Sequence, residues 1–176
     1  MIFTSITPEA FDHKNIPNDI HEMNDHIKNL LVNAPPSHEI PFEVLQDIRR
    51  QGGGLLAFQP YSDRAENRQV GHGDQKVTIR IFNHDSPDFI YMHIHGGGHC
   101  IGAADMQDQS LEKISKELNC VVVSVEYRLA PTNPYPAAPD DCETAATWLI
   151  ENSKKEFNTE KTVSYTHLRA HETIQH

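Results

Sequence analysis

The sequence predicts an α/β protein whose central sheet is partly parallel. Residues 89–94 and 120–125 are almost continuously apolar, as expected for strands that are covered on both faces. Between them, residues 105–119 place apolar side chains at helical spacing. A strand, a helix and a strand in this order predict a parallel pair joined by a right-handed crossover.

Two short helices are predicted before this unit. Residues 19–32 carry apolar side chains at helical spacing until two consecutive prolines stop the helix. A second helix is predicted to begin at Pro41, which suits a first helical position, and to end before the glycines at 52–54. Neither helix carries residues typical of catalysis, so we expect residues 1–54 to form a cap.

The remaining elements complete a predicted core at residues 55–162. Residues 64–70 and 76–82 flank a glycine-rich turn, and the second of these segments alternates apolar with polar side chains. This pattern predicts a β-hairpin with a half-buried second arm. Residues 140–157 predict another crossover helix, and a further parallel strand is expected after Lys161.

The end of the sequence departs from this pattern. Residues 163–173 read V-S-Y-T-H-L-R-A-H-E-T, which resembles a translated transposase-end adapter from a sequencing library. Segments of this kind are excluded from reasoning about the fold. We therefore expect residues 163–176 to be a non-native tail and the authentic sequence to stop near Thr162. The tail also holds four residues that could be written as a triad: Ser164, His167, His171 and Glu172. No glycines flank this serine, so it lacks the sharp turn that a nucleophile needs.

The composition is typical of a globular protein and excludes several classes of function. A formal net charge of −10 and a pI of about 5.6 argue against a nucleic-acid-binding protein. No apolar run approaches the length of a membrane span, and the first residues lack the features of a signal peptide. Three widely spaced cysteines predict free thiols in a reducing compartment: Cys100, Cys120 and Cys142. We therefore expect a cytoplasmic protein.

The first predicted parallel strand runs into a glycine turn, and the chain reads H-I-H-G-G-G-H-C-I-G at 93–102. The three consecutive glycines, 96–98, leave backbone N–H groups unobstructed by side chains. Such a turn can hold an anion or the oxyanion of an acyl-transfer intermediate. Preorganised N–H donors around that oxygen typically contribute about 3–4 kcal/mol each.

A second motif makes the glycine turn more specific. Residues 125–131 read V-E-Y-R-L-A-P, and P-Y-P-A-A at 134–138 is followed by Asp140 and Asp141. Together with H-G-G-G at 95–98, this segment resembles the hormone-sensitive-lipase-like (fold-3) esterases of the α/β-hydrolase fold. The resemblance extends over about residues 19–161. It implies the N-terminal part of an α/β-hydrolase sheet, with an antiparallel first hairpin, then parallel strands with crossover helices, and N-terminal cap helices.

The resemblance also implies a function and the residues that carry it. The family hydrolyses carboxylic esters through an acyl-enzyme and needs no metal or cofactor, and short- to medium-chain esters are the expected substrates. Gly97 and Gly98 would supply oxyanion-hole amides, Gly96 would allow the turn, and His95 would support the loop rather than act as a base. Three further residues would have structural roles: Asp108, Tyr127 and Arg128.

This sequence departs from the family pattern in two substitutions and one absence. His99 stands where an aromatic or aliphatic residue is usual, which either makes the acyl or alcohol pocket more polar or reflects drift. Thr132 stands where glutamate is common. The nucleophile, acid and base of the triad, which follow in the order Ser, Asp or Glu, His, are absent. Oxyanion donors without a nucleophile cannot form an acyl-enzyme.

We therefore expect a full-length parent that is an esterase and a fragment that is inactive. The expected partner is a small-molecule ester, with no nucleic acid and no membrane span, and the parent is compatible with a homodimer. Because the sheet is incomplete, we also expect strand 120–125 to expose one face.

Two other functions stay open on the sequence alone. Relatives of this family that have lost a triad member act as small-molecule receptors, and fold does not fix function. A zinc site is the other alternative, because imidazole and thiolate are zinc ligands and four such residues lie close in sequence: His93, His95, His99 and Cys100.

Overall fold

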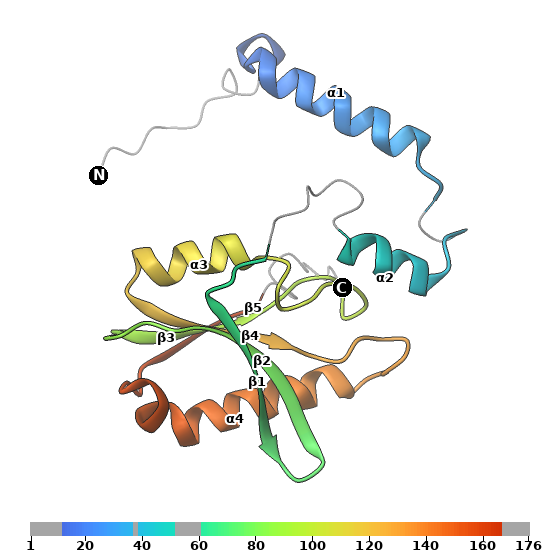
Figure 1. Cartoon of the computed structure of the whole chain (residues 1–176). Coiled ribbons are helices and arrows are strands. Elements are labelled where there is room, and N and C mark those ends of the chain that lie inside the picture. Colours follow the sequence, from blue (N-terminus) through green and yellow to red (C-terminus); the bar gives the residue numbers. More distant parts are fainter. Residues whose placement is uncertain (1–11, 37–38, 52–60, 167–176) are drawn as a thin grey trace, which may run out of the picture.

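A computed structural model describes residues 12–36, 39–51 and 61–166. Its elements follow the predicted order, as Figure 1 shows: a 3-10 turn His13–Asn15, α1 Asn18–Asn33, α2 Phe42–Arg50, β1 Ala65–His72, β2 Gln75–Phe82, β3 Phe89–Ile94, α3 Asp108–Glu117, β4 Cys120–Glu126, α4 Ala137–Phe157 and β5 Thr162–Thr166. The glycines 52–54, which are predicted to end the second helix, lie outside the described residues.

The strands form one five-stranded mixed sheet in the order β1-β2-β4-β3-β5. The predicted hairpin is confirmed, because β1 and β2 pair antiparallel, and β2 then pairs antiparallel with β4. The predicted parallel pair is also confirmed, with β3 parallel to β4 and Ile90 opposite Val121. The strand expected after Lys161 is present as β5, which pairs parallel with the other side of β3.

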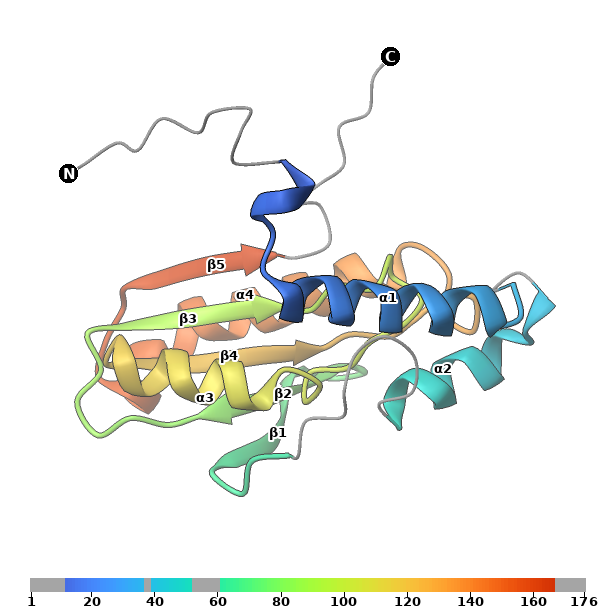
Figure 2. The ribbon, with the colours of Figure 1, turned by 90° about the horizontal axis from the view of Figure 1, so that it is seen from above.

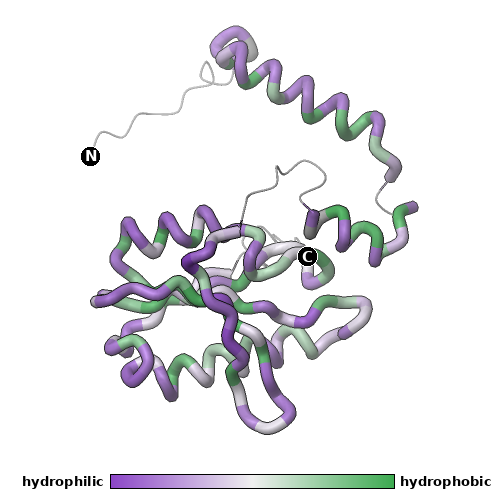
Figure 3. The backbone as a smooth tube through the Cα atoms, in the orientation of Figure 1, coloured by the Kyte–Doolittle hydropathy of each residue, from purple (hydrophilic) through white to green (hydrophobic). Residues whose placement is uncertain are grey.

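Helices cover both faces of this sheet, with α3 on one side and α4 on the other (Figure 1). Alternate residues of β4 supply both cores, since Val121, Val123 and Val125 pack toward α4 while Cys120 and Val122 belong to the cluster around Leu111 of α3. The apolar strands therefore run through the middle of the molecule, as the hydropathy colours of Figure 3 show.

The expectation that residues 120–125 expose one face is wrong. Each of these residues is 0% exposed. The strand order places β4 between β2 and β3, so neither of its edges is open, and the two crossover helices cover its faces. The edge strands of the sheet are instead β1 and β5, and all five residues of β5 are exposed.

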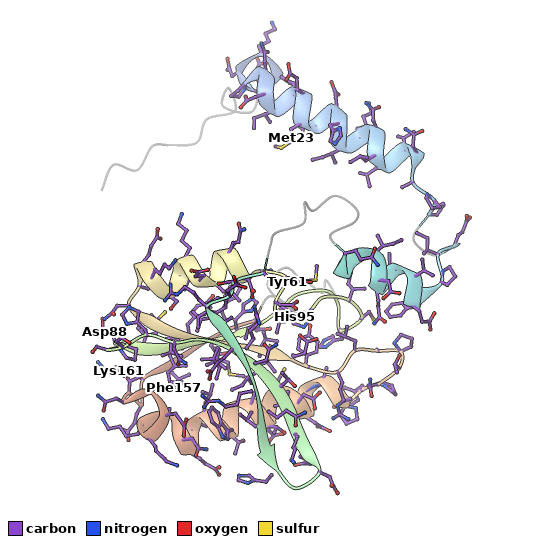
Figure 4. The ribbon with its side chains drawn as sticks, in the orientation of Figure 1. Met23, Tyr61, Asp88, His95, Phe157 and Lys161 are labelled. Carbon is purple, nitrogen blue, oxygen red and sulfur yellow. The ribbon has the colours of Figure 1, made fainter. Side chains whose placement is uncertain are left out.

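The two N-terminal helices lie on the side of the sheet where β3 and β4 end (Figures 1 and 2). None of the residues of α1 is buried. Its Met23, labelled in Figure 4, is 51% exposed and projects from the helix without reaching the sheet. The helix α2 lies nearer and makes a direct hydrogen bond to the core, described below.

The boundary predicted between core and tail falls inside β5. Thr162 and the next four residues form the strand, while residues 167–176 lie outside the described residues. The division into residues 1–54, 55–162 and 163–176 therefore stays a prediction.

Candidate functional site

The glycine turn begins where β3 ends, at the carboxyl edge of the parallel strands. His95 and Gly96 follow Ile94 directly, and the turn continues to Gly102 before the chain enters α3. In open α/β sheets this edge is where ligands bind. The sequence prediction of a strand, a glycine turn and a helix is confirmed.

The backbone of the turn is left-handed at several consecutive positions. Gly97 has a φ of 132°, Gly98 a φ of 62° and His99 a φ of 61°. A Cβ atom on Gly97 would lie 1.9 Å from the carbonyl oxygen of Ile101, so only glycine fits there. No heavy atom would lie within 4 Å of a Cβ on Gly98, so glycine is favoured there only by the positive φ, which His99 also adopts.

The N–H groups of Gly97 and Gly98 take no part in the hydrogen bonds that close the turn. Those bonds run from the N–H groups of Cys100 and Ile101 to the Gly97 carbonyl oxygen, each over 3.1 Å. Within the described part of the chain, the N–H groups of Gly97 and Gly98 donate to no acceptor. Gly98 is exposed and Gly97 is half-buried.

His95 fixes the base of the turn from inside the protein. Its ring is stacked on that of Tyr127 with centroids 4.1 Å apart, and the Tyr127 hydroxyl donates to the His95 carbonyl oxygen over 2.8 Å. Nδ1 of His95 lies 3.0 Å from the Gly96 carbonyl oxygen, which assigns the proton to Nδ1. Figure 4 shows this histidine at the end of the sheet nearest α2.

The environment of His95 keeps its ring neutral. The residue is 2% exposed, and burial lowers the pKa of its imidazole from 6.5 to about 4. Nε2 is buried without a hydrogen-bond partner in the described part of the chain. A side chain so enclosed is poorly placed to exchange protons with a substrate. The supporting role of His95 stays a prediction.

Two contacts hold the outer side of the turn. The Ala130 N–H donates to the His99 carbonyl oxygen over 2.9 Å, and Nε2 of Gln46, in α2, donates to the Cys100 carbonyl oxygen over 2.9 Å. Sequence reasoning missed Gln46, because it lies 54 residues from its partner in a helix without any motif.

The charged residues assigned structural roles do form structural contacts. Nε and Nη2 of Arg128 donate to the carboxylate of Asp141, over distances of 2.8–3.1 Å, so the aspartate is Asp141 and not Asp140. Asp108, at the start of α3, pairs with Arg80 of β2 and is 1% exposed. Both pairs anchor loops next to the glycine turn.

Comparisons with known proteins agree with this geometry. A family model described as alpha/beta hydrolase fold matches residues 91–164. One relative in sequence is an arylesterase of Saccharolobus solfataricus, which is 31% identical over 61% of this chain and 37% of its own length. Another is the carboxylesterase NlhH of Mycobacterium tuberculosis, which is 36% identical over 51% of this chain and 30% of its own length. Among solved structures, an arylesterase superposes with a TM-score of 0.62 at 23% identity, covering 86% of this chain and 48% of that one.

The chain has the N-terminal part of an α/β-hydrolase fold. It spans about a third of the length of these curated relatives and about half of the solved structure. The family match includes the end of the turn-bearing strand, the glycine turn, α3, β4 and α4.

A pocket of about 380 Å³ opens beside the turn of this α/β-hydrolase chain. Gly98, His99 and Cys100 line one side, and Ala130, Asn133 and Tyr135 line the other. The His99 imidazole therefore borders a pocket that adjoins one of the exposed amides.

The described residues provide no accessible pair of nucleophile and base. Nδ1 of His93 lies 3.0 Å from the hydroxyl of Ser124, but the two residues are 1% and 0% exposed, so no substrate reaches them. Ser164 lies in β5 and is exposed. The tail residues that could be written as its triad partners lie outside the described residues: His167, His171 and Glu172.

The zinc alternative gains no support from the geometry. Among the described residues, no three histidine, cysteine or acidic side chains come together as metal ligands. His93 and His95 each face a different partner, since the first meets Ser124 and the second meets Tyr127. No helix in the described ranges has the length and apolar character needed to cross a membrane.

Proposed function

We propose that the glycine turn is half of the oxyanion hole of a carboxylic-ester hydrolase. The observation that carries this proposal is the pair of N–H groups on Gly97 and Gly98, which donate to no acceptor in the described part of the chain, in residues that are half-buried and exposed. Backbone donors that are shielded from water are normally satisfied within a protein, which makes the open N–H of the half-buried Gly97 the more informative of the two. A pair left open at the carboxyl edge of a sheet is poised to receive a ligand oxygen.

The chemistry that fits this pair is acyl transfer through a covalent intermediate. A serine hydroxyl attacks the ester carbonyl, its proton passes to a histidine, and the carbonyl oxygen gains the negative charge of a tetrahedral intermediate. Gly97 and Gly98 would donate to that oxygen, and collapse of the intermediate would expel the alcohol and leave an acyl-enzyme. Water would then release the acid by the same route. Gly96 contributes its carbonyl to hold the His95 ring, and no metal or cofactor enters any step.

The serine, acid and base would come from the part of the protein that the relatives possess and this chain does not span. Relatives named as carboxylesterase and arylesterase support ester hydrolysis as the activity of the longer protein. The 176-residue chain alone would then be inactive. The pocket of about 380 Å³ suits short- to medium-chain esters, which are small-molecule substrates.

The test compares this chain with a protein extended by the next codons of its source DNA. The extended protein is expected to hydrolyse p-nitrophenyl butyrate and to be labelled by a fluorophosphonate, and this chain to do neither. Turnover by this chain at an esterase-like rate would contradict the missing-triad argument. An extended protein that binds esters without turnover would favour the receptor alternative.

A substitution in the extended protein tests the oxyanion role itself. Gly97→Ala places a Cβ atom 1.9 Å from the Ile101 carbonyl oxygen and must displace the peptide, so kcat is expected to fall by roughly 100- to 1000-fold. Gly73→Ala is the matched control, because Gly73 also has a positive φ, of 56°, but lies in the β1–β2 turn with open space around it. Equal kcat values for the two variants would refute the assignment.

A further inference from the structure

The α2 helix touches the glycine turn at a point from which it can influence the Gly98 amide. Nε2 of Gln46 donates to the carbonyl oxygen of Cys100 over 2.9 Å. Beside this contact, a hollow of about 310 Å³ separates α2 from the loop that follows β4. The hydrogen bond therefore bridges two parts of the chain that are otherwise spaced apart there.

Rigid peptide planes extend the effect of this hydrogen bond into the turn. The Cys100 carbonyl and the Ile101 N–H belong to one planar peptide unit, so fixing the first orients the second. The Ile101 N–H donates to the Gly97 carbonyl oxygen over 3.1 Å. That carbonyl shares its own peptide plane with the Gly98 N–H, the amide proposed to face the oxyanion.

A parallel route reaches the same peptide from the loop that follows β4. The Ala130 N–H donates to the His99 carbonyl, whose peptide includes the Cys100 N–H, and this N–H also donates to the Gly97 carbonyl oxygen. The Gly97 carbonyl thus accepts two hydrogen bonds, one oriented from the loop after β4 and one from α2. Two bonds to one carbonyl also polarise its peptide and strengthen the attached N–H as a donor.

We propose that Gln46 is a positioning residue for the oxyanion hole, through which the docking of α2 sets the direction of the Gly98 N–H. This inference rests on the proposed function for its catalytic meaning, but not for its structural content. The helix α2 would then be part of the apparatus that holds the donor, rather than only a cover above it.

The structural content can be measured on this chain by NMR. Gln46→Glu keeps the length and helix preference of the side chain but replaces the donor with a carboxylate that repels the carbonyl. The Ile101 amide is expected to exchange with solvent more than five-fold faster, because the loss of one neutral hydrogen bond alone gives roughly a five-fold change and the repulsion adds to it. The residual dipolar coupling of the Gly98 N–H is expected to change as well. Gln46→Met, which removes the donor without adding charge, should give a smaller change of the same kind.

Asp47→Asn is the matched control, because this neighbouring side chain in α2 is exposed. It should leave both the Ile101 exchange rate and the Gly98 coupling at their original values, with the α3 and β4 amides unchanged in every variant. The inference is overturned if Gln46→Glu matches Asp47→Asn in both measurements.

Kinetics in the extended protein separate this inference from the proposed function. Gln46→Glu should lower kcat about five-fold with KM unchanged, since a displaced oxyanion donor affects the transition state and not ground-state binding. An active extended protein in which Gln46→Glu leaves kcat unchanged refutes the positioning role and leaves the esterase proposal intact. An inactive extended protein whose NMR changes persist refutes the esterase proposal and leaves the α2 connection intact.

Discussion

The buried imidazole of His95 makes the stability of this fold depend on pH in a defined window. Burial lowers its pKa from 6.5 to about 4 in the folded protein, while the unfolded chain returns it to 6.5. Between these two values the unfolded state binds a proton that the folded state does not. The contribution of the neutral His95 ring to the free energy of unfolding is therefore fully present above pH 6.5, and it is lost as the pH falls from 6.5 to about 4.

The size of the loss follows from the shift in proton affinity. Each tenfold change in that affinity is worth about 1.4 kcal/mol, so the His95 contribution is on the order of 3 kcal/mol. Contacts with Lys116 and Ser62 hold the pKa of the Glu112 carboxylate at about 2, below its ordinary 4.5. The stability that these contacts provide is therefore lost only as the pH falls from 4.5 to about 2. The pH range in which His95 lowers the stability therefore lies above that of Glu112, and the two ranges meet near pH 4.

Urea unfolding at a series of pH values measures this effect. A plot of the unfolding free energy should fall by about 3 kcal/mol between pH 6.5 and pH 4, and His95→Gln should remove most of that slope. The ring protons of His95 provide a second readout that needs no variant. The claim that this ring is buried and neutral would be refuted if its protons titrated with a midpoint near 6.5 in the folded protein. It would also be refuted if the unfolding free energy had the same slope against pH in the His95→Gln variant and in the unaltered chain.

Two further substitutions test other contacts around the turn. Asp108→Ala leaves the guanidinium of Arg80, a residue that is 8% exposed, without its carboxylate partner. The unfolding free energy measured in urea should therefore fall by about 3–5 kcal/mol. A loss below about 1 kcal/mol would mean that the pair is not desolvated. Gly102→Ala puts a methyl group 2.5 Å from Nδ1 of His95 and should cost about 1–3 kcal/mol in thermal or urea unfolding. Gly73→Ala shares the positive φ without the close contact, so equal losses for the two glycines would contradict the packing argument.

Local patterns were enough to predict the elements of this fold. Apolar runs gave β3 and β4, and helical spacing gave α3 and α4. Errors occurred at the ends, where short-range geometry decides. The helix predicted over residues 105–119 ends at Glu117, and Asn119 takes a left-handed φ of 51°. Leu118 therefore lies beyond the helix and is 52% exposed.

Contacts between distant residues could not be predicted in the same way. Periodicity places a residue on a face, but it does not give the order of strands, and the burial of β4 depends on that order. The motif located the glycine turn and its partner Tyr127. It gave no sign of Gln46 or Arg80, because a hydrogen bond across many residues leaves no pattern in a single sequence.

The left-handed backbone of His99 has a consequence for how this position responds to selection. A side chain with a Cβ atom costs about 1–2 kcal/mol in that conformation, and glycine would remove the cost. A library of variants screened for thermal tolerance should therefore enrich glycine here. A library screened for turnover of one ester in the extended protein should keep whichever side chain suits the pocket beside Gly98. The difference between the residues that the two screens enrich at position 99 would measure how much the His99 side chain contributes to substrate choice.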